Sequence, residues 1–595
     1  MNFYKYFHQK ILKIVQDLAA QDNILLKEIN FNLEVPKNEF YGDVATNAAM
    51  VLSKSFNKPV LELAEIFKEK FKQIPEFQSI EVVKPGFINI VIKDYFWQNM
   101  LKAILDQGKN YGRDSVGDEL AKENELINVE YVSANPTGPL HIGHGRGAVI
   151  GDIIANLYRF LGFKVIKEYY INDAGNQVNI LANSLYFRYL EYFAAKVGKQ
   201  NLENFKNLYA PEGKFYPGEY LVAAADKLAK SDKNKWLNVP EKQWHPFFKK
   251  YALDTMLNLI KADLALIDIK QDVFSSEQAI ATGVAYDEII ADFSKRDLIY
   301  KGTLNPPKGK IIEDFEPREQ KLFRSTQFGD DIDRPLEKND GEKTYFANDL
   351  VYHNDKLKRG ATKLINVLGA DHIGYVKRIQ FGVMALSHNK VKLEVICCQL
   401  INLLDNNLPI KMSKRAGNFV TLKDLVENVG KDIFRFMMIV RKNDMPIDFD
   451  LAKIKEQTID NPIFYIQYAY ARVNSVFKNA QEVFPDIKEQ DLSYSDFSLL
   501  TQEYELNLLK SLCKLPKILE ITLQYNDPHK LYLFLMEISK NFHSLWNKGK
   551  EGDILRFIVR NNKNLTISRL SLLKAVSFTI ANILNILGVN IRESM

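Results

Sequence analysis

Apolar residues recur along the chain with two different spacings, and these spacings predict helices and strands. Over the first twenty residues they return roughly every three to four positions, the spacing of an amphipathic helix. A strand-like run at 31–35 ends at Pro36, a helix is expected around 45–55, and a strand over 87–92 follows a Pro-Gly turn. We therefore expect a small α/β domain over residues 1–115, with the polar stretch 118–125 as a linker.

The central part of the chain alternates between strand-like and helical patterns. Residues 126–132 form a buried-strand pattern that ends in a turn cluster at 135–139, and helical spacing over 144–161 leads to a second strand at 163–171. This order is a βαβ unit, which implies parallel strands and a right-handed crossover. Further strand-like runs lie at 343–347, 363–368 and 391–404. Together they predict an α/β fold, with a Rossmann-type doubly wound parallel sheet over 116–410.

Long helical patterns interrupt this sheet and also follow it. Residues 182–300 are aromatic-rich and helical, so we expect them to form an insertion that splits the sheet into halves. After about residue 450 most strand patterns vanish, and helical spacing recurs over 463–477, 531–546 and 570–587. We interpret residues 451–595 as an all-α C-terminal bundle.

Composition narrows the class of protein without naming a partner. The 595 residues predict about three to five domains, and 46% hydrophobic with 26% charged residues is typical of a soluble globular chain. A net charge of +5 neither requires nor excludes nucleic acid, so an RNA-binding face would need locally clustered lysines. Three cysteines without a CxxC motif favour a reducing cytoplasm and argue against structural zinc.

Targeting and membrane segments are not expected. No apolar run reaches the length of a membrane span. The first twenty residues are mildly amphipathic, as in an organellar presequence, but they lack arginine and serine and contain Asp17. We therefore favour a first domain helix and a cytoplasmic protein.

Two histidines stand at the turn between the first central strand and its helix. His141 and His144 flank an Ile-Gly pair at the carboxyl end of that strand, where doubly wound sheets bind ligands. The N-terminus of the following helix attracts phosphate, and Gly143 lets a nucleotide approach the backbone closely. A glycine-rich packing turn with incidental histidines is the alternative, but the position between a strand and a helix favours a nucleotide site.

A basic pentapeptide, Lys411-Met-Ser-Lys-Arg415, lies far downstream between Pro409 and a Gly-Asn pair, which predicts a flexible loop. A solvated basic turn is the alternative. The two motifs, in this order, resemble the paired signatures of class I aminoacyl-tRNA synthetases, which activate an amino acid with ATP. The resemblance implies that the ATP contacts are His141, Gly143, His144, Lys411, Met412, Ser413 and Lys414. The two histidines and two lysines are the expected catalytic residues, and 411–450 is expected to hold the signature loop and a stem-contact region.

Other catalytic motifs are missing from the sequence. We find no P-loop, no GxGxxG, no HExxH and no credible covalent nucleophile. Adenylation needs none of these, because the carboxylate of the substrate attacks the α-phosphate and the enzyme positions the reactants and stabilises negative charge.

Longer stretches resemble one member of this class, the arginyl-tRNA synthetases, over nearly the whole chain. They include Val129-Glu-Tyr-Val-Ser-Ala-Asn135, Tyr170-Ile-Asn-Asp-Ala-Gly-Asn-Gln177, Tyr345-Phe-Ala-Asn-Asp349, Gly369-Ala-Asp-His372 and, near the N-terminus, Tyr41-Gly-Asp-Val-Ala-Thr-Asn47. A guanidinium is planar and permanently charged, so its pocket needs carboxylates and an aromatic or carbonyl rim. The resemblance implies that Tyr345 and Asp349 contact the guanidinium and that Glu130 and Asn135 lie near the polar end of the substrate. Glu277 is a further candidate carboxylate for binding arginine. For Asp349, a helix cap is the alternative role.

The segment from Asn461 to Arg472 resembles the opening of the anticodon-binding bundle of this family. It places aromatic, amide and cationic side chains at helical spacing, where unpaired bases could stack on them. Core packing of the tyrosines explains the spacing equally well. The resemblance implies that Tyr465, Arg472 and Met595 contact tRNA, and that the N-terminal domain touches the tRNA elbow.

The expected reaction joins L-arginine to tRNA-Arg through an arginyl-adenylate, with Mg²⁺ entering alongside ATP and no metal site on the protein. We expect a monomer without DNA or membrane partners. The resemblance also implies that arginine activation requires bound tRNA. Three alternatives remain open: another class I synthetase, a non-catalytic tRNA-binding paralogue with the same fold, and a small nucleotidyltransferase. The missing zinc-type cysteines, the intact motifs and the additional domains argue against each in turn.

Overall fold

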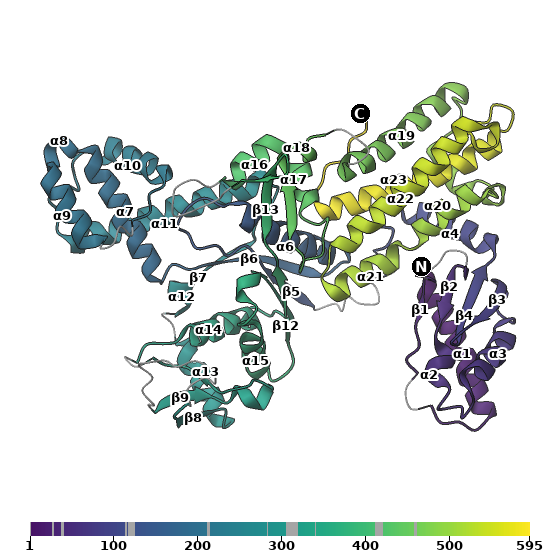
Figure 1. The fold of residues 1–595 in the computed structure, drawn as a ribbon, viewed down its shortest axis with the longest axis horizontal. Coiled ribbons are helices and arrows are strands. Elements are labelled where there is room, and N and C mark those ends of the chain that lie inside the picture. Colours follow the sequence, from purple (N-terminus) through teal and green to yellow (C-terminus); the bar gives the residue numbers. More distant parts are fainter. Residues whose placement is uncertain are drawn as a thin grey trace.

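The N-terminal part of the molecule is a small α/β domain. In this computed structural model the described residues are 2–26, 29–36, 41–113, 116, 125–210, 215–281, 284–304, 319–338, 341–410, 420–456 and 461–594. The domain contains α1 (Phe3–Gln21), β1 (Leu33–Glu34), β2 (Val44–Thr46), α2 (Ala48–Leu52), α3 (Val60–Phe71), β3 (Phe77–Val83), β4 (Phe87–Ile92) and α4 (Asp94–Gln107). Its antiparallel sheet has the order β1-β2-β4-β3, and helices cover one face (Figure 1).

The strand expected over 87–92 is confirmed as β4. The helix expected around 45–55 begins only at Ala48, because residues 44–46 pair with β4 as β2. The linker expected over 118–125 lies outside the described residues except for Glu125.

A five-stranded parallel sheet forms the centre of the molecule. Its strands are β5 (Leu126–Glu130), β6 (Lys164–Ile171), β7 (Val273–Ser276), β11 (Lys363–Gly369) and β12 (Lys392–Cys398), in the order β12-β11-β5-β6-β7. Helix α6 (Ile142–Phe160) connects β5 to β6, as expected for the βαβ unit. The strand order reverses between β5 and β11, so their carboxyl ends border the ligand crevice of this fold. The Rossmann-type doubly wound sheet is confirmed.

Two sequence predictions within this region are wrong. The run at 343–347 is not a strand, because the Thr344 side chain accepts a hydrogen bond from the Ala347 N–H and begins helix α14 (Tyr345–Lys358). The run at 391–404 is two strands in different sheets, since β12 ends at Cys398 and β13 (Ile401–Asp405) pairs with β14 (Leu408–Pro409) and β15 (Ile447–Asp450).

The insertion between β6 and β7 is a helical lobe with its own core. It comprises α7 (Asn176–Tyr192), α8 (Ala194–Val197), α9 (Lys199–Tyr209), α10 (Glu219–Asp232) and the start of the long α11 (Glu241–Leu266), packed around rings such as Tyr186 and Trp244. The helical pattern expected over 182–300 fails at β7, which returns to the main sheet, since four residues are too few to show a period.

A second lobe follows β7 and carries α14. It contains α12 (Glu277–Ala281), α13 (Ala285–Lys295), β8 (Ile299–Gly302), β9 (Gln320–Phe323), β10 (Arg334–Pro335), α14 and α15 (Val376–Leu386). The three short strands form an antiparallel sheet on the far side of the helices from the main sheet (Figure 1).

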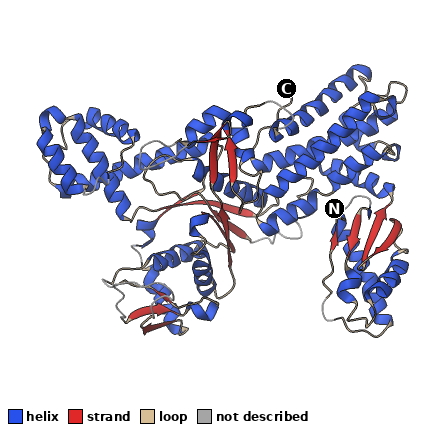
Figure 2. Ribbon diagram, in the orientation of Figure 1, coloured by secondary structure: helices blue, strands red, loops and turns tan. Residues whose placement is uncertain are grey.

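The C-terminal part is helical, as expected (Figure 2). After α16 (Leu422–Val429) and α17 (Lys431–Met437) come α18 (Leu451–Ile454), α19 (Pro462–Val483), α20 (Glu503–Cys513), α21 (Leu515–Tyr525), α22 (His529–Glu551) and α23 (Lys563–Leu587). Helix α23 is apolar and long enough to cross a membrane by length and composition, but 72% of its apolar window is buried in the bundle. One hydrophobic core continues from the N-terminal domain through the sheet into this bundle.

Candidate active site

The two histidines of the first motif form the N-terminal cap of α6. His141 is the N-cap residue, and its Nδ1 accepts the N–H of Gly143 at 3.1 Å. The Nδ1 of His144 accepts the N–H of His141 at 3.3 Å, and the two rings stack with centroids 3.8 Å apart. In each neutral ring the proton is therefore on Nε2, the atom that can donate to a phosphate oxygen. Helix dipole and imidazole donors thus coincide at the crevice.

The segments that flank residues 411–419 converge on the same cap. Thr421 forms a β-bridge with His141, and the N–H of Leu422 donates to the carbonyl of Leu140 at 2.8 Å. At the other end, the N–H of Ile410 donates to Leu403 of β13 at 2.9 Å. The predicted contacts Lys411, Met412, Ser413 and Lys414 lie outside the described residues.

Arg146 joins α6 to the strands that lie before and after residues 411–419 in the chain. It is buried, and its guanidinium donates to the carbonyls of Gln399 at 2.9 Å, Met445 at 2.7 Å and Lys442 at 2.7 Å. These carbonyls border β13 and β15. Arg146 therefore holds that small sheet beside the histidine cap, although it is absent from the sequence predictions.

A buried row of polar residues crosses the sheet beneath α14. Glu130 and Asn366 are register partners on β5 and β11. The ammonium group of Lys356 donates to Glu130 at 2.5 Å and to Asn366 at 3.2 Å, and none of its side chain is exposed. Glu168, the partner of Glu130 on β6, receives two hydrogen bonds from Arg359 at 2.7 and 2.9 Å. Both carboxylates are thus paired with cations of the protein itself. The charge of Glu130 is therefore already balanced by Lys356.

Asp349 differs, because within the described part of the chain no cation forms an ion pair with its carboxylate. It lies on the second turn of α14, and the Tyr375 hydroxyl donates to it. The pKa of Asp349 is raised to about 7, chiefly by burial and also by the charges of Glu130 and Glu277, against the hydrogen bond from Tyr375, which lowers it. A buried carboxylate held partly protonated beside other acids is a site that a cation would stabilise.

Glu277, the first residue of α12, faces the same space. Asn348 donates to its carboxylate at 3.3 Å. Burial, together with the charge of Asp173, raises the pKa of Glu277. The pKa of Tyr170 is raised by burial and by the charges of Glu277 and Asp349. The structure therefore brings Glu277 and Asp349, two of the predicted arginine contacts, near each other.

The other two predicted arginine contacts, Tyr345 and Asn135, are exposed. Tyr345 begins α14 and is 79% exposed, one helical turn before Asp349 on the same face. Asn135 is also exposed, in the turn between β5 and α6. Sequence reasoning did not identify Lys356 and Tyr375. Lys356 follows Asp349 by seven positions and so shares its helix face, whereas nothing local indicated Tyr375.

The predicted tRNA contacts of the bundle form a cluster around His543. Arg472 donates to Nδ1 of His543 at 3.2 Å and to the hydroxyl of Tyr468 at 2.7 Å. The ring of Tyr465 lies 4.4 Å from that of His543. Burial lowers the pKa of His543 to about 4, so its ring is neutral near pH 7. Tyr465 and Arg472 are thus together, and Met595 lies outside the described residues.

The parallel sheet, its switch point and the histidine-capped helix define the catalytic domain of a class I aminoacyl-tRNA synthetase. Residues 101–475 match the family model described as "tRNA synthetases class I (R), catalytic domain". Residues 5–92 match "Arginyl tRNA synthetase N terminal domain", and residues 466–595 match "DALR anticodon binding domain". The chain belongs to the arginyl-tRNA synthetase family.

Curated relatives and solved structures agree with this placement. The chain is 43% identical to an arginine–tRNA ligase of Rhizobium rhizogenes and 45% identical to one of Xanthobacter autotrophicus, each over 100% of both chains. A putative arginyl-tRNA synthetase structure from Campylobacter jejuni is 30% identical, with a TM-score of 0.69 over 85% of this chain and 100% of that one. The Thermus thermophilus arginyl-tRNA synthetase shares the fold, with a TM-score of 0.70 at 16% identity over 100% of both chains.

Proposed function

We propose that this protein attaches L-arginine to tRNA-Arg in two steps, of which only the first consumes ATP. Arginine and MgATP give arginyl-adenylate and pyrophosphate, and the arginyl group then passes to the 2′-hydroxyl of the terminal adenosine with release of AMP. The observation that carries the specificity is Asp349, a buried carboxylate with a pKa of about 7 that forms no ion pair with a cation among the residues the structure describes. A guanidinium would supply the missing charge and five fixed donors.

The carboxylates would hold the side chain of arginine, and the α6 cap would hold ATP. Asp349 and Glu277 would bind the guanidinium, with Tyr345 at the entrance, while Asn135 and the Glu130 region would meet the polar end of the substrate. Bound in this way, the substrate carboxylate would be positioned to attack the α-phosphate without a covalent enzyme intermediate.

The phosphate side of the reaction would depend on positive charge. His141 and His144 would donate to the phosphates, where the dipole of α6 adds to their effect, and Gly143 would let the nucleotide approach the backbone. Lys411, Met412, Ser413 and Lys414 would cover the pyrophosphate. Mg²⁺ would arrive with ATP, bound to its phosphates.

The remaining regions would bind tRNA. Residues 1–115 would contact the elbow, 411–450 the acceptor stem, and 451–595 the anticodon, with Tyr465, Arg472 and Met595 among the contacts. In this proposal 116–410 is the catalytic domain, with 182–300 as its insertion. The protein would act as a cytoplasmic monomer that needs neither DNA nor a membrane.

The decisive experiment is arginine-dependent exchange of pyrophosphate into ATP, with and without tRNA-Arg, against a panel of other amino acids. Exchange with arginine alone among the panel would support the proposal, and a requirement for tRNA-Arg would support the coupled mechanism. Exchange with a different amino acid would contradict the assigned specificity. Folded protein that binds tRNA but shows no exchange would favour a non-catalytic role.

A further inference from the structure

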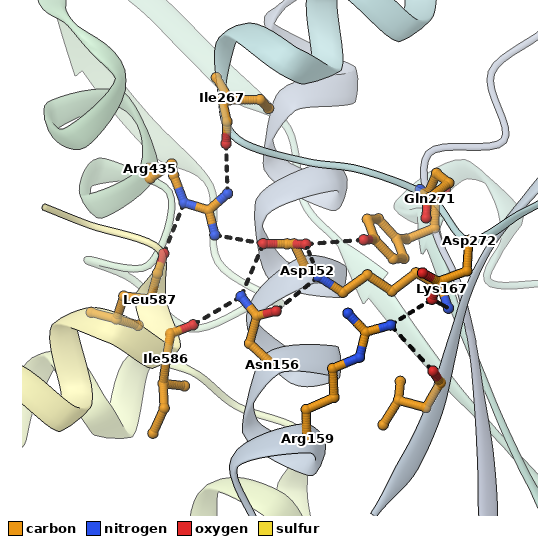
Figure 3. A network of polar contacts seen from close by, with 12 residues as sticks. Asp152, Asn156, Arg159, Lys167, Ile267, Gln271, Asp272, Arg435, Ile586 and Leu587 are labelled. Carbon is orange, nitrogen blue, oxygen red and sulfur yellow. Dashed lines mark hydrogen bonds and ion pairs between the residues drawn. The ribbon is translucent and has the colours of Figure 1, made fainter. Parts of the chain in front are cut away.

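A buried arginine outside the crevice joins three parts of the molecule. Arg435 lies on α17, and none of its side chain is exposed. Its Nε donates to the carbonyl of Leu587 at 2.8 Å, its Nη1 to that of Ile267 at 2.7 Å, and its Nη2 to the carboxylate of Asp152 at 2.7 Å (Figure 3). Leu587 ends α23, Ile267 caps the end of α11, and Asp152 lies on α6. One side chain therefore connects the bundle and the insertion to the helix that carries the histidines.

The charges around this side chain are balanced. Asp152 also accepts Lys167 at 2.6 Å and Tyr131 at 3.1 Å, so two buried cations share one buried carboxylate. The C-terminal end of a helix carries about −0.5 charge, and Arg435 caps two such ends. Two helix ends therefore offset the one excess positive charge. Arg435 needs all three of its acceptors, the two helix ends and the Asp152 carboxylate. Without one of them, part of its buried charge would have no partner.

The segment that carries Arg435 also contacts the histidine cap, through the β-bridge between Thr421 and His141. Asp152 lies eleven residues after His141 along α6, a distance of about 16 Å at the rise of an α-helix. Thr421 and Arg435 belong to one short segment containing α16 and α17, and they contact α6 at these two places. The same segment follows residues 411–419 directly. Moving Arg435 would therefore tilt this segment relative to His141.

We infer that Arg435 is a positioning residue for the adenylation site: by joining the ends of α23 and α11 to Asp152, it sets how the segment after the signature loop lies against the histidine cap. The inference rests on the proposed function. Arg435 itself touches no substrate. A displacement of about 1 Å at reacting groups can reduce a rate by about 10²-fold, so a small change at this distant site is sufficient to affect kcat.

The bundle offers a closely matched control. Arg569 is buried and donates to the Glu505 carboxylate and to two carbonyls, those of Arg556 and Ile554, each at 2.6 Å. It has the same set of acceptors as Arg435, but all of them lie within the C-terminal helices and their connections. Arg435→Lys and Arg569→Lys thus make the same chemical change in two different places. In each, a guanidinium that donates to three acceptors is replaced by a single ammonium group.

The test compares both variants by melting temperature and by arginine-dependent pyrophosphate exchange with tRNA present. We expect both to lose stability, while only Arg435→Lys lowers kcat, by about 10-fold or more, with the KM for arginine changed less than about threefold. Arg569→Lys should retain kcat within about twofold. Equal kcat values for the two variants would overturn the inference. A wild-type protein without arginine-dependent exchange would instead contradict the proposed function.

Gly588 provides a variant that leaves every hydrogen-bonding group intact. It has φ +66°, and a Cβ there would lie 2.4 Å from Nη2 of Arg435. Gly588→Ala should therefore push the guanidinium away from Asp152 and lower kcat in the same direction as Arg435→Lys. Gly198 is the control, because it has φ +83° and no atom within 4 Å of its Cβ position, so it has comparable backbone strain without the contact. If Gly588→Ala matches Gly198→Ala in kcat, the positioning role is refuted, even where Arg435→Lys fails to fold.

Discussion

Asp349 is the buried carboxylate whose replacement tests the arginine pocket most directly. Asp349→Asn keeps the size of the side chain, and its amide oxygen can still accept the Tyr375 hydroxyl, but the negative charge is lost. Removing one partner of a buried charge pair costs about 3–5 kcal/mol. Since 1.4 kcal/mol corresponds to a factor of ten, the KM for arginine should rise by at least about 10²-fold, measured by pyrophosphate exchange.

The same substitution should stabilise the protein when arginine is absent. The pKa of Asp349 rises from 3.8 to about 7 on folding, a shift of about three units or roughly 4 kcal/mol. The folded state therefore keeps its proton between about pH 4 and 7 while the unfolded chain loses it, so wild-type stability falls as pH rises through that window. Asparagine has no such loss. The stability advantage of the variant should grow by about 2 kcal/mol between pH 5.5 and pH 8.

Thermal unfolding without arginine at these two pH values measures this effect, and exchange kinetics measure the loss of binding. The expected pattern is a protein that binds arginine poorly yet melts at a higher temperature, with the larger increase at pH 8. A variant whose KM for arginine stays within about threefold of wild type would show that Asp349 does not contact the guanidinium. A lower melting temperature at pH 8 would show that the carboxylate is not desolvated as described.

Three further outcomes follow from the site. Because arginine binds the ionised form of Asp349, the KM for arginine should rise about tenfold per pH unit below about pH 7. Tyr375→Phe removes a hydrogen bond that lowers the pKa of Asp349, so it should move the midpoint of this rise to higher pH in a pH series of exchange rates. Replacing His144 or Lys414 by alanine should reduce adenylation by about 10² or more in the same assay, and an unchanged rate would contradict their roles. Lys356→Met should lower the free energy of unfolding by about 3–5 kcal/mol in denaturant titration, because it leaves a carboxylate on β5 buried without its cation, and a loss below about 1 kcal/mol would refute that account.

The central βαβ unit was predictable because its signals are local. Residues 126–171 contain a short apolar run, a turn cluster, a helical repeat and a second run, each recognisable from neighbouring residues. The histidine motif could be placed at the end of β5 for the same reason. Local signals misled at 343–347, where aromatic residues are typical of a strand but Thr344 caps a helix. Strand β7 was missed, since its membership of the sheet depends on pairing with β6 and not on its four residues alone.

The sequence by itself determined the class of fold, the nucleotide motif and, through resemblance, the family and Asp349 as a candidate ligand, with Glu277 as a further candidate carboxylate. Only the tertiary structure decided which charges are paired. Lys356 meets Glu130 from 226 residues away, and Arg435 meets Leu587 across 152 residues. Such partners follow no sequence period, because they meet only after the sheet, the lobes and the bundle have packed. The elevated pKa of Asp349 has the same origin, since burial and neighbouring carboxylates are properties of the folded chain.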